Sequence, residues 1–367
     1  MLSKVFMNFN TFFLKSFRIL LFPLSLVYGL IIMVRNFLFD KNIFKSSAFN
    51  FPLISVGNLS AGGTGKSPMV EYLISLLKDE FKVATISRGY KRKTKGYVLA
   101  SENTTALEIG DEPMQFHIKF PEMPVAVGEE RIVAIPQLLH DRPGTEAIIL
   151  DDAFQHRTIR PGFNILLTAY NDLFTDDFFL PTGDLRDSKS SSRRAQIIVV
   201  TKCPGYLPEE EKESITEEIN PNKNQQVFFT TIEYSTPYHI TNHHPKNISP
   251  GDEVLLVCGI ANPKPLQNFL QINTSSYTML TYSDHHIFTI DDIKEINKKF
   301  DYIPSSNKYI LTTEKDAVRF LKFSEQLDTM PLYIIPIKHS FLFNEAKKFD
   351  ETVIGFIKDF KNNQRDK

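Results

Sequence analysis

Short apolar runs alternate with helix-length amphipathic stretches along most of the chain. The first five runs are rich in Ile, Val and Leu and cover residues 51–56, 82–87, 146–152, 163–168 and 196–202. Near-continuous apolar runs of strand length, separated by helical segments, are typical of a parallel sheet covered on both faces. The pattern therefore predicts an α/β core with a mainly parallel sheet over residues 49–203.

A polar stretch follows this core, and a second α/β pattern follows the polar stretch. Residues 204–250 contain an acidic run and a part rich in Pro, Asn and His, and 226–234 reads as a strand between them. Apolar runs return at 253–260, 308–320 and 332–337, with a helical pattern after the first of them. We predict a linker with a β-hairpin at 204–250 and a second, smaller α/β lobe at 251–367.

The first 48 residues follow neither pattern. The run 19–34 is apolar apart from Ser25 but is interrupted by Pro23 and Gly29, whereas a bilayer-spanning helix needs about 20 apolar residues. The first fifty residues hold ten of the 31 phenylalanines and six basic residues against one acidic residue. That composition favours a helix lying on an anionic cytoplasmic leaflet, although a helix packed on the protein's own core remains the alternative. We predict a membrane-associating helical segment at 1–48.

The net charge bears on the binding partners of the protein, and the cysteines bear on its compartment. The formal net charge is -1 over 367 residues, so nothing favours nucleic acid, and no obligate protein partner is indicated. Cys203 and Cys258 are far apart and lack the spacing of metal ligands. They are expected to be small buried residues in a reducing compartment, which indicates the cytoplasm.

Residues 55–68 read SVGNLSAGGTGKSP, the sequence of a phosphate-binding loop between a strand and a helix. The glycines allow backbone N–H groups to face the phosphates. Lys66 would bridge the β- and γ-phosphates, and Ser67 would offer its hydroxyl to Mg²⁺. Ser60 departs from the pattern GxxxxGK[ST], which has glycine there. The expected nucleotide-binding residues are Ser60, Ala61, Gly62, Gly63, Thr64, Gly65, Lys66 and Ser67.

Two adjacent aspartates, Asp151 and Asp152, follow the apolar run 147–150. A phosphate loop needs an acidic partner for Mg²⁺ at the end of a neighbouring strand. Because adjacent side chains of a strand point to opposite faces, we expect Asp151 to hold the metal and Asp152 to orient a water or a substrate group, with the reverse assignment left open. Alone, such a pair more often forms a helix cap or a turn. Beside the loop it predicts a metal site.

An ordered series of motifs resembles the tetraacyldisaccharide 4'-kinase family of lipid A biosynthesis. Any one motif is weak or moderate, but the whole series in register is specific and covers most of the chain. The motifs are SVGNLSAGGTGKSP (55–68), ISRGY (86–90), GDEP (110–113), PVAVGEER (124–131), ILDDAFQH (149–156), LPTGDLRD (180–187), CGIANP (258–263), SDHHIF (283–288) and TTEKDAV (312–318).

The resemblance implies a kinase that uses ATP and Mg²⁺ to phosphorylate the 4'-hydroxyl of an acylated glucosamine disaccharide 1-phosphate. It implies a P-loop NTPase-like core, a smaller α/β lobe and an N-terminal membrane-associating helix at the cytoplasmic face of the inner membrane, peripheral or monotopic. It makes Asp111 the carboxylate that accepts the hydroxyl proton, assisted by His285, with His286 as the alternate. Lys66, Asp152 and His156 complete the expected catalytic set, although His156 has a structural role as an equal alternative.

Departures from the family pattern bear on further residues. Ala153 replaces a glycine, and Asp187 stands where the family has a glutamate. The resemblance makes Asp187 a candidate metal ligand, with a side chain one methylene shorter. Arg131 and Arg186 are candidates for stabilising the γ-phosphate. A basic loop either binds the substrate phosphate or is simply solvated; it contains Arg88, Lys91, Arg92, Lys93 and Lys95.

Two other classes of nucleotide-binding protein are less consistent with the sequence. A GTPase would carry an NKxD motif after a later strand, whereas 199–205 reads VVTKCPG and lacks the aspartate. A kinase of soluble small molecules would not need the basic, Phe-rich N-terminal segment. The sequence therefore favours a lipid kinase.

Overall fold

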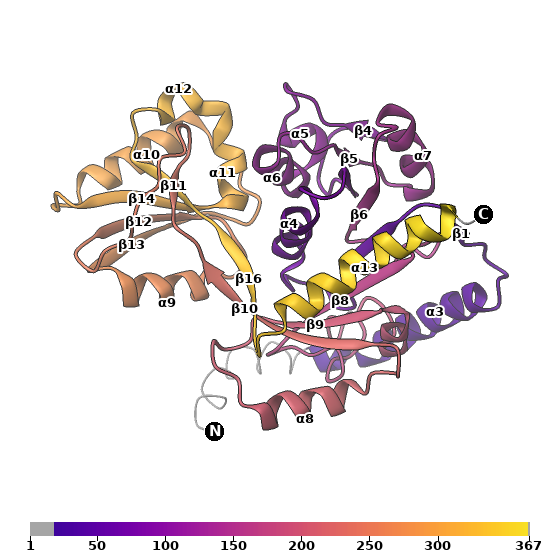
Figure 1. Ribbon diagram of the computed structural model, residues 1–367. Coiled ribbons are helices and arrows are strands. Elements are labelled where there is room, and N and C mark those ends of the chain that lie inside the picture. The colour runs from indigo at the N-terminus through magenta and orange to yellow at the C-terminus, as the bar shows by residue number, and fades with distance from the viewer. Residues whose placement is uncertain (1–17, 366–367) are drawn as a thin grey trace.

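The structure is a computed structural model that describes residues 18–365. It consists of a larger and a smaller α/β lobe, with helix α13 (Ala346–Arg365) crossing the larger lobe (Figure 1). Residues 1–17 of the predicted N-terminal segment lie outside the described part of the chain. The predicted α/β class with a mainly parallel sheet is confirmed.

The larger lobe is built on a nine-stranded sheet with the spatial order β16-β10-β9-β8-β2-β6-β3-β5-β4. The seven central strands run parallel, and one antiparallel strand lies at each edge. Strands β2, β3, β6 and β9 are buried along their whole length, as their apolar runs predict. The strands are β2 (Leu53–Asn58), β3 (Val83–Ser87), β4 (Val98–Leu99), β5 (Val125–Val127), β6 (Ala147–Asp151), β8 (Phe163–Ala169), β9 (Ile197–Thr201), β10 (Gln226–Tyr234) and β16 (Ile337–Phe341).

Helices cover both faces of this sheet. On one face, apolar residues of α4 (Lys66–Leu77) and α13 form a single core with the strands. The other face packs against α7 (Arg131–Asp141) and α8 (Glu209–Ile219). Three shorter helical elements complete the lobe: α5 (Ala106–Ile109), α6 (Asp111–Lys119) and the 3-10 helix η2 (Lys189–Arg194).

The smaller lobe has a five-stranded sheet with the order β11-β15-β14-β12-β13, parallel except for β11 at one edge. Its strands are β11 (Tyr238–His239), β12 (Glu253–Cys258), β13 (Ser276–Thr281), β14 (Lys308–Thr313) and β15 (Leu332–Ile335). Its helices are α9 (Lys264–Asn273), α10 (Ile290–Asp301), α11 (Glu314–Phe320), η3 (Leu321–Phe323) and α12 (Ser324–Leu327).

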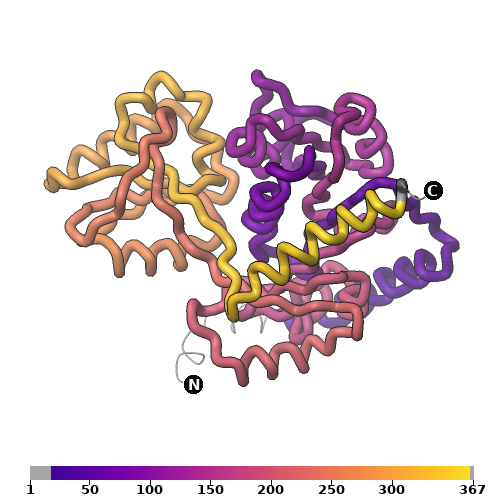
Figure 2. The backbone as a smooth tube through the Cα atoms, in the orientation of Figure 1, coloured from indigo at the N-terminus to yellow at the C-terminus, as the bar shows by residue number. Residues whose placement is uncertain are grey.

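The boundary between the lobes differs from the prediction. The first half of β10 pairs with β9 of the large sheet, and its second half pairs with β16 from near the end of the chain. Strand β10 is therefore not part of a hairpin within residues 204–250, although Tyr238 and Pro245 form an antiparallel bridge in that range. The second lobe also does not extend to residue 367, because β16 and α13 return to the larger lobe. Strands β10 and β16 together connect the lobes (Figure 2).

The periodicity of α13 explains why its placement was missed. Phe349, Val353 and Ile357 recur every four residues and are fully buried in the core of the larger lobe. Such spacing predicts a helix with one buried face. It does not tell which lobe buries that face, so chain order alone assigned α13 to the wrong lobe.

The N-terminal helix α3 (Phe22–Asp40), preceded by the 3-10 turn η1 (Ile19–Leu21), turns its polar side toward the larger lobe. Ser25 and Asn36 are buried and lie 2.7 Å from Thr182 Oγ1 and Asp187 Oδ1, respectively. Apart from Asp40 at the last position, the exposed side chains are apolar and include Leu24, Leu26, Val27, Leu30, Ile31, Met33, Val34 and Phe37. Among the described residues, only Ile19–Asp40 forms a helix long and apolar enough to cross a membrane.

Neither Pro23 nor Gly29 interrupts this helix. Pro23 lies in the first turn, where its missing N–H is not needed. A Cβ on Gly29 would come within 2.7 Å of the Phe179 ring, so the glycine allows the helix to approach the lobe closely. A two-stranded pairing of β1 (Ser47–Ala48) with β7 (Ile159–Arg160) then ties down the segment after the helix.

Candidate active site

The predicted phosphate loop lies between β2 and α4. Gly62 and Gly65 have φ angles of 122° and 85°, which residues with a Cβ rarely adopt, so glycine is favoured at both positions. Helix α4 begins directly after Gly65, and the free N–H groups of its first turn therefore face the loop. The Ala61 N–H donates instead to Asp184 O at 2.6 Å, which places the available donors at residues 62–67.

Three consecutive carbonyl groups of the loop are held by side chains behind it. Thr201, Lys202 and His339 contact the carbonyl oxygens of Thr64, Gly63 and Gly65, respectively. The Thr201 hydroxyl and His339 Nε2 lie 2.8 and 2.9 Å from their carbonyl oxygens. Because a carbonyl and the following N–H point to opposite sides of a trans peptide, the N–H groups of residues 64–66 face away from these anchors. They are therefore directed toward a phosphate site.

His339 links this loop to the connection between the lobes. Burial lowers its pKa to about 4, so the ring is neutral at physiological pH. A neutral ring carries one N–H: Nε2 donates to Gly65 O, and Nδ1 accepts from the Thr230 hydroxyl at 2.9 Å. His339 belongs to β16 and Thr230 to β10, so both connecting strands support the loop.

Lys66 and Arg186 converge on Asp152. Lys66 Nζ lies 3.6 Å from Asp152 Oδ1, and Arg186 Nη2 lies 3.0 Å from the same oxygen. Lys66 also lies 3.3 Å from Asn58 Oδ1. Burial opposes ionisation of Asp152, but Lys66 and Arg186 outweigh it and lower the pKa of Asp152 to about 2. The structure thus gathers a charged carboxylate and two cations at the phosphate loop.

Asp151, at the end of β6, has the features of a metal ligand. Its Oδ2 lies 3.3 Å from the Ser87 hydroxyl, whereas its Oδ1 is buried without a hydrogen-bond partner. Burial, followed by the nearby charges of Glu112 and Asp152, raises the pKa of Asp151 to about 7. A divalent cation would pair with the orphaned oxygen and favour the ionised carboxylate. Asp151 therefore fits Mg²⁺, with the hydroxyl of Ser67 in the first turn of α4 as a second ligand.

The protein alone does not enclose such an ion. Within residues 18–365, no group of three or more His, Cys, Asp or Glu side chains could hold a metal. Mg²⁺ keeps several waters and is commonly held by one or two carboxylates together with substrate phosphates. The remaining ligands would accordingly come from nucleotide and water.

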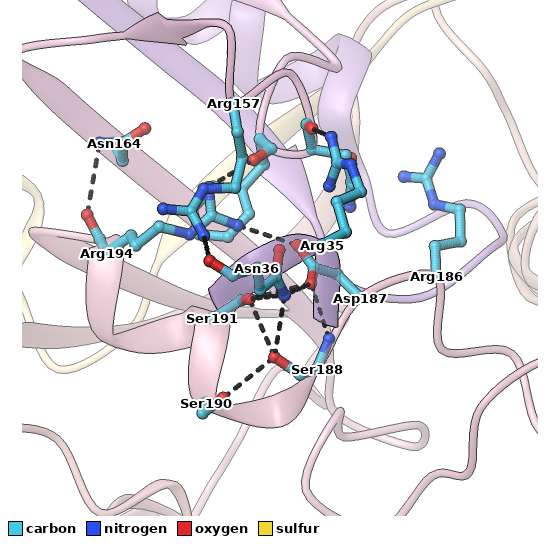
Figure 3. Close-up of polar contacts among 12 residues, drawn as sticks. Arg35, Asn36, Arg157, Asn164, Arg186, Asp187, Ser188, Ser190, Ser191 and Arg194 are labelled. Atoms are coloured by element: carbon cyan, nitrogen blue, oxygen red, sulfur yellow. Dashed lines mark hydrogen bonds and ion pairs between the residues drawn. The ribbon is translucent and has the colours of Figure 1, made fainter. Parts of the chain in front are cut away.

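Asp187 is held by hydrogen bonds within the protein, and its predicted metal role stays a prediction. It is fully buried, and both carboxylate oxygens are taken up by hydrogen bonds within the protein (Figure 3). Oδ1 lies 2.7 Å from Asn36 Nδ2 and 2.9 Å from the Ser191 hydroxyl, while Oδ2 pairs with Arg194 at 2.9 Å. Asp187 therefore anchors helix α3, because Asn36 belongs to that helix.

The structure brings Asp111 and His285 together across the two lobes. His285 Nδ1 lies 2.8 Å from Asp111 Oδ2, and Arg319 Nη2 lies 2.7 Å from the same oxygen. The alternate, His286, points elsewhere and pairs with Asp292 at 3.0 Å. Glu112, the residue after Asp111, is close enough to raise the pKa of Asp151. The neighbour of Asp111 in the sequence therefore lies close to the carboxylate at the end of β6.

Three further residues that the sequence predicts at the site differ in whether they are free to bind a ligand. His156 is neutral, because burial, assisted by Arg131 and Arg88, lowers its pKa to about 4. Arg131 is buried and donates to backbone carbonyls, including that of Asp151 at 3.2 Å, which is a structural position. Arg92 of the basic loop pairs with Glu129 at 2.7 Å and is not free for a ligand.

Comparison with known proteins shows the family of this chain. The family described as Tetraacyldisaccharide-1-P 4'-kinase matches residues 17–358. The chain belongs to this family. Tetraacyldisaccharide 4'-kinases from Flavobacterium johnsoniae and Bacteroides thetaiotaomicron are 46% and 42% identical over 93% and 92% of this chain, covering 98% and 93% of their own lengths.

A solved structure of the family shares the fold. The crystal structure of LpxK from Aquifex aeolicus in complex with ATP has a TM-score of 0.73 and 29% identity, and covers 93% of this chain and 99% of that chain. The resemblance inferred from the ordered motifs is thereby confirmed.

Sequence reasoning missed four residues of this tetraacyldisaccharide 4'-kinase site. Thr201 and Lys202 lie at the end of the apolar run 196–202, which predicts a strand but no contact with the phosphate loop. His339 lies in a strand assigned to the other lobe. Arg319 follows directly after the motif TTEKDAV, and that position was the available signal.

Proposed function

We propose that this chain transfers the γ-phosphoryl group of ATP to the 4'-hydroxyl of an acylated glucosamine disaccharide 1-phosphate. The observation that carries the proposal is the pairing of Asp111 with His285 across the lobes, beside a phosphate loop. We therefore place the nucleotide site and the acceptor carboxylate in one active site. The same arrangement would be unnecessary in a protein that only binds nucleotide.

The proposed nucleotide half consists of residues 62–67, Asp151 and Asp152. The N–H groups of the loop hold the phosphates, and Lys66 moves from Asp152 to the β- and γ-phosphates. Ser67 and Asp151 would hold Mg²⁺. When bound, this ion would neutralise part of the phosphate charge. Asp152 pairs with Arg186 and, until nucleotide binds, also with Lys66.

In the proposed acceptor half, Asp111 takes the hydroxyl proton. The 4'-oxygen forms a bond to the γ-phosphorus, the bond from that phosphorus to the β,γ-bridging oxygen breaks, and ADP leaves. His285 Nδ1 donates to Asp111 and fixes its orientation. His156 is neutral and partly buried, and we assign it to positioning of the loop around Asp152.

The lipid part of the substrate suits the exposed surface of α3. This helix presents apolar side chains outward and holds its polar side against the lobe, so we propose that it lies in the cytoplasmic leaflet of the inner membrane without crossing it. Spanning would require the buried contacts of Ser25 and Asn36 to break. Flotation with anionic vesicles tests this, and a chain that never floats contradicts it.

The activity test compares acylated disaccharide 1-phosphate in detergent with its deacylated form, using γ-labelled ATP and Mg²⁺. We expect label on the 4'-oxygen of the acylated substrate, and none in the Asp111→Ala variant. Label on neither sugar would contradict a lipid kinase. A fully active Asp111→Ala variant would remove Asp111 from the mechanism.

A further inference from the structure

Two helices meet across the lobe interface, with an ion pair at each end. Helix α6 of the larger lobe and helix α11 of the smaller lobe lie side by side (Figure 1). At one end Arg319 pairs with Asp111, and at the other Lys119 pairs with Glu314. The helices therefore run antiparallel. Each has its acidic residue at the N-terminus and its basic residue toward the C-terminus, which its dipole favours.

The guanidinium of Arg319 is held firmly. Its side chain is only 6% exposed, and its Nη1 lies 3.3 Å from Asp316 Oδ1. Asp316 is fixed in turn by the Gly259 N–H at 3.0 Å and the Thr313 hydroxyl at 2.8 Å. A buried charge is tolerated where it is paired, and two carboxylates supply the pairing here. Arg319 is thus a fixed group against which Asp111 is oriented.

Asp111 receives its side-chain hydrogen bonds on one oxygen. Arg319 Nη2 and Nε lie 2.7 and 3.1 Å from Oδ2, and His285 Nδ1 lies 2.8 Å from that same atom. Among the described residues, no hydrogen bond is donated to Oδ1. Oδ2 therefore anchors the carboxylate, and Oδ1 is left to accept from a hydroxyl.

We propose that Arg319 is a positioning residue that holds Asp111 through Oδ2 so that Oδ1 faces the acceptor hydroxyl. This inference rests on the proposed function, in which Asp111 takes the hydroxyl proton. The charge acts as well as the geometry: burial favours the neutral acid, but Arg319 and His285 outweigh burial and lower the pKa of Asp111. Arg319 thereby keeps the carboxylate ionised.

Further charged or titratable groups from both lobes lie beside Asp111 in the sequence or contact its partners. They are Asp284, His285, Lys315, Asp316 and Arg319 on the smaller lobe, and Tyr90 and Glu112 on the larger lobe. In the described part of the chain, the side chains that hydrogen-bond the Asp111 carboxylate are those of His285 and Arg319. Loss of the Arg319 charge should therefore shift the titration of Asp111 directly.

The test is steady-state kinetics of full-length Arg319→Gln and Arg319→Lys as a function of pH, on the acylated substrate in detergent. We expect Arg319→Gln to lower kcat on the order of 100-fold, because a misaligned carboxylate rarely meets the hydroxyl. The acidic limb of its pH profile should move to higher pH while the KM for ATP stays unchanged. Arg319→Lys keeps the positive charge but has a single nitrogen as donor. Its acidic limb should therefore lie at the wild-type pH, whereas kcat should be restored only in part.

A matched control and the Asp111→Ala variant separate the possible outcomes. Lys294→Gln removes an exposed cation of the smaller lobe, which pairs with Asp291 at the surface, and should leave the kinetics unchanged. Wild-type kcat and pH profile in Arg319→Gln, beside an inactive Asp111→Ala, would overturn the inference and leave the proposed function standing. If Arg319→Gln fails to fold, Arg319→Lys decides: about tenfold loss of kcat supports the inference, and wild-type kcat overturns it.

Discussion

The nucleotide half and the acceptor half of the proposed site are built in different ways. The phosphate loop belongs to one lobe, and its carbonyl groups are fixed by Thr201, Lys202 and His339 of the same sheet or its edge. The acceptor carboxylate Asp111 is instead oriented by His285 and Arg319 of the other lobe. The first half is therefore preorganised within one lobe, whereas the second half depends on contact between the lobes.

This difference predicts which changes should affect each half. A change in the phosphate loop should weaken nucleotide binding whether or not the two lobes are in contact. A change at the lobe interface should spare nucleotide binding and impair transfer, because it displaces the group that receives the proton. Variants that affected both halves equally would contradict this division.

The largest effect is expected from Lys66→Met. Removing the cation that faces the phosphates should lower kcat/KM for ATP by about 10³-fold. ATP affinity, measured by calorimetric titration, should fall in Lys66→Met and remain normal in Asp111→Ala. Lys78→Met, at the exposed end of the same helix, should match the wild type. Loss of ATP affinity in Asp111→Ala would show that the halves are not separate.

A second prediction concerns a buried charge cluster at the lobe interface. Lys119 Nζ lies 2.6 Å from both Glu71 Oε2 and Glu314 Oε1. Burial, followed by the charge of Glu314, raises the pKa of Glu71 from its ordinary value of 4.5 to about 7. Between these values the folded protein holds a proton that the unfolded chain has lost. The free energy of unfolding should therefore decrease as the pH rises through this range.

Glu71→Gln tests the direction of this pH dependence, because the glutamine side chain does not titrate in this pH range. The decrease in the free energy of unfolding from about pH 5 to about pH 8 should be ~2 kcal/mol smaller in the variant than in the wild type. Denaturant titration at both pH values measures the difference. Asp151 contributes in the same direction in both proteins, so it cancels. Glu80→Gln, an exposed pair with Lys358, should retain the full decrease.

The same division explains what the sequence could predict. The phosphate loop and Asp151 were found because strand, loop and helix are adjacent in the chain, so local spacing carries the signal. Asp111 and His285 are 174 residues apart, and only the family resemblance paired them. The contact of Asp187 with Asn36 could not be predicted either, because a motif reports position in the chain and not the partner of a buried side chain.

The two connecting strands were missed for a related reason. An apolar strand pattern gives burial but not the pairing partner, and β10 changes partner from β9 to β16 half-way along its length. His339 therefore looked like a residue of the second lobe, remote from the nucleotide. Its contact with Gly65 exists only because β16 returns to the large sheet.

His339→Phe should have a smaller effect than Lys66→Met and is the sharpest test of the division. The variant leaves the Gly65 carbonyl without its buried donor, while Thr201 and Lys202 still hold the neighbouring carbonyls. We expect the KM for ATP to rise about tenfold, or about 1.4 kcal/mol, with a smaller change in kcat. Steady-state kinetics at varied ATP concentration measures both constants.

Thr230→Val tests whether His339 supports the phosphate loop through its hydrogen bonds or only through the burial of its ring. It removes the hydroxyl that donates to His339 Nδ1 but keeps the ring and its contact with Gly65, so the KM for ATP should rise less than in His339→Phe. If His339→Phe instead lowered kcat and left the KM for ATP unchanged, the connecting strands would act on the acceptor half. Thr201 and Lys202 would then suffice to hold the phosphate loop, and nucleotide binding would not depend on the strands that connect the lobes.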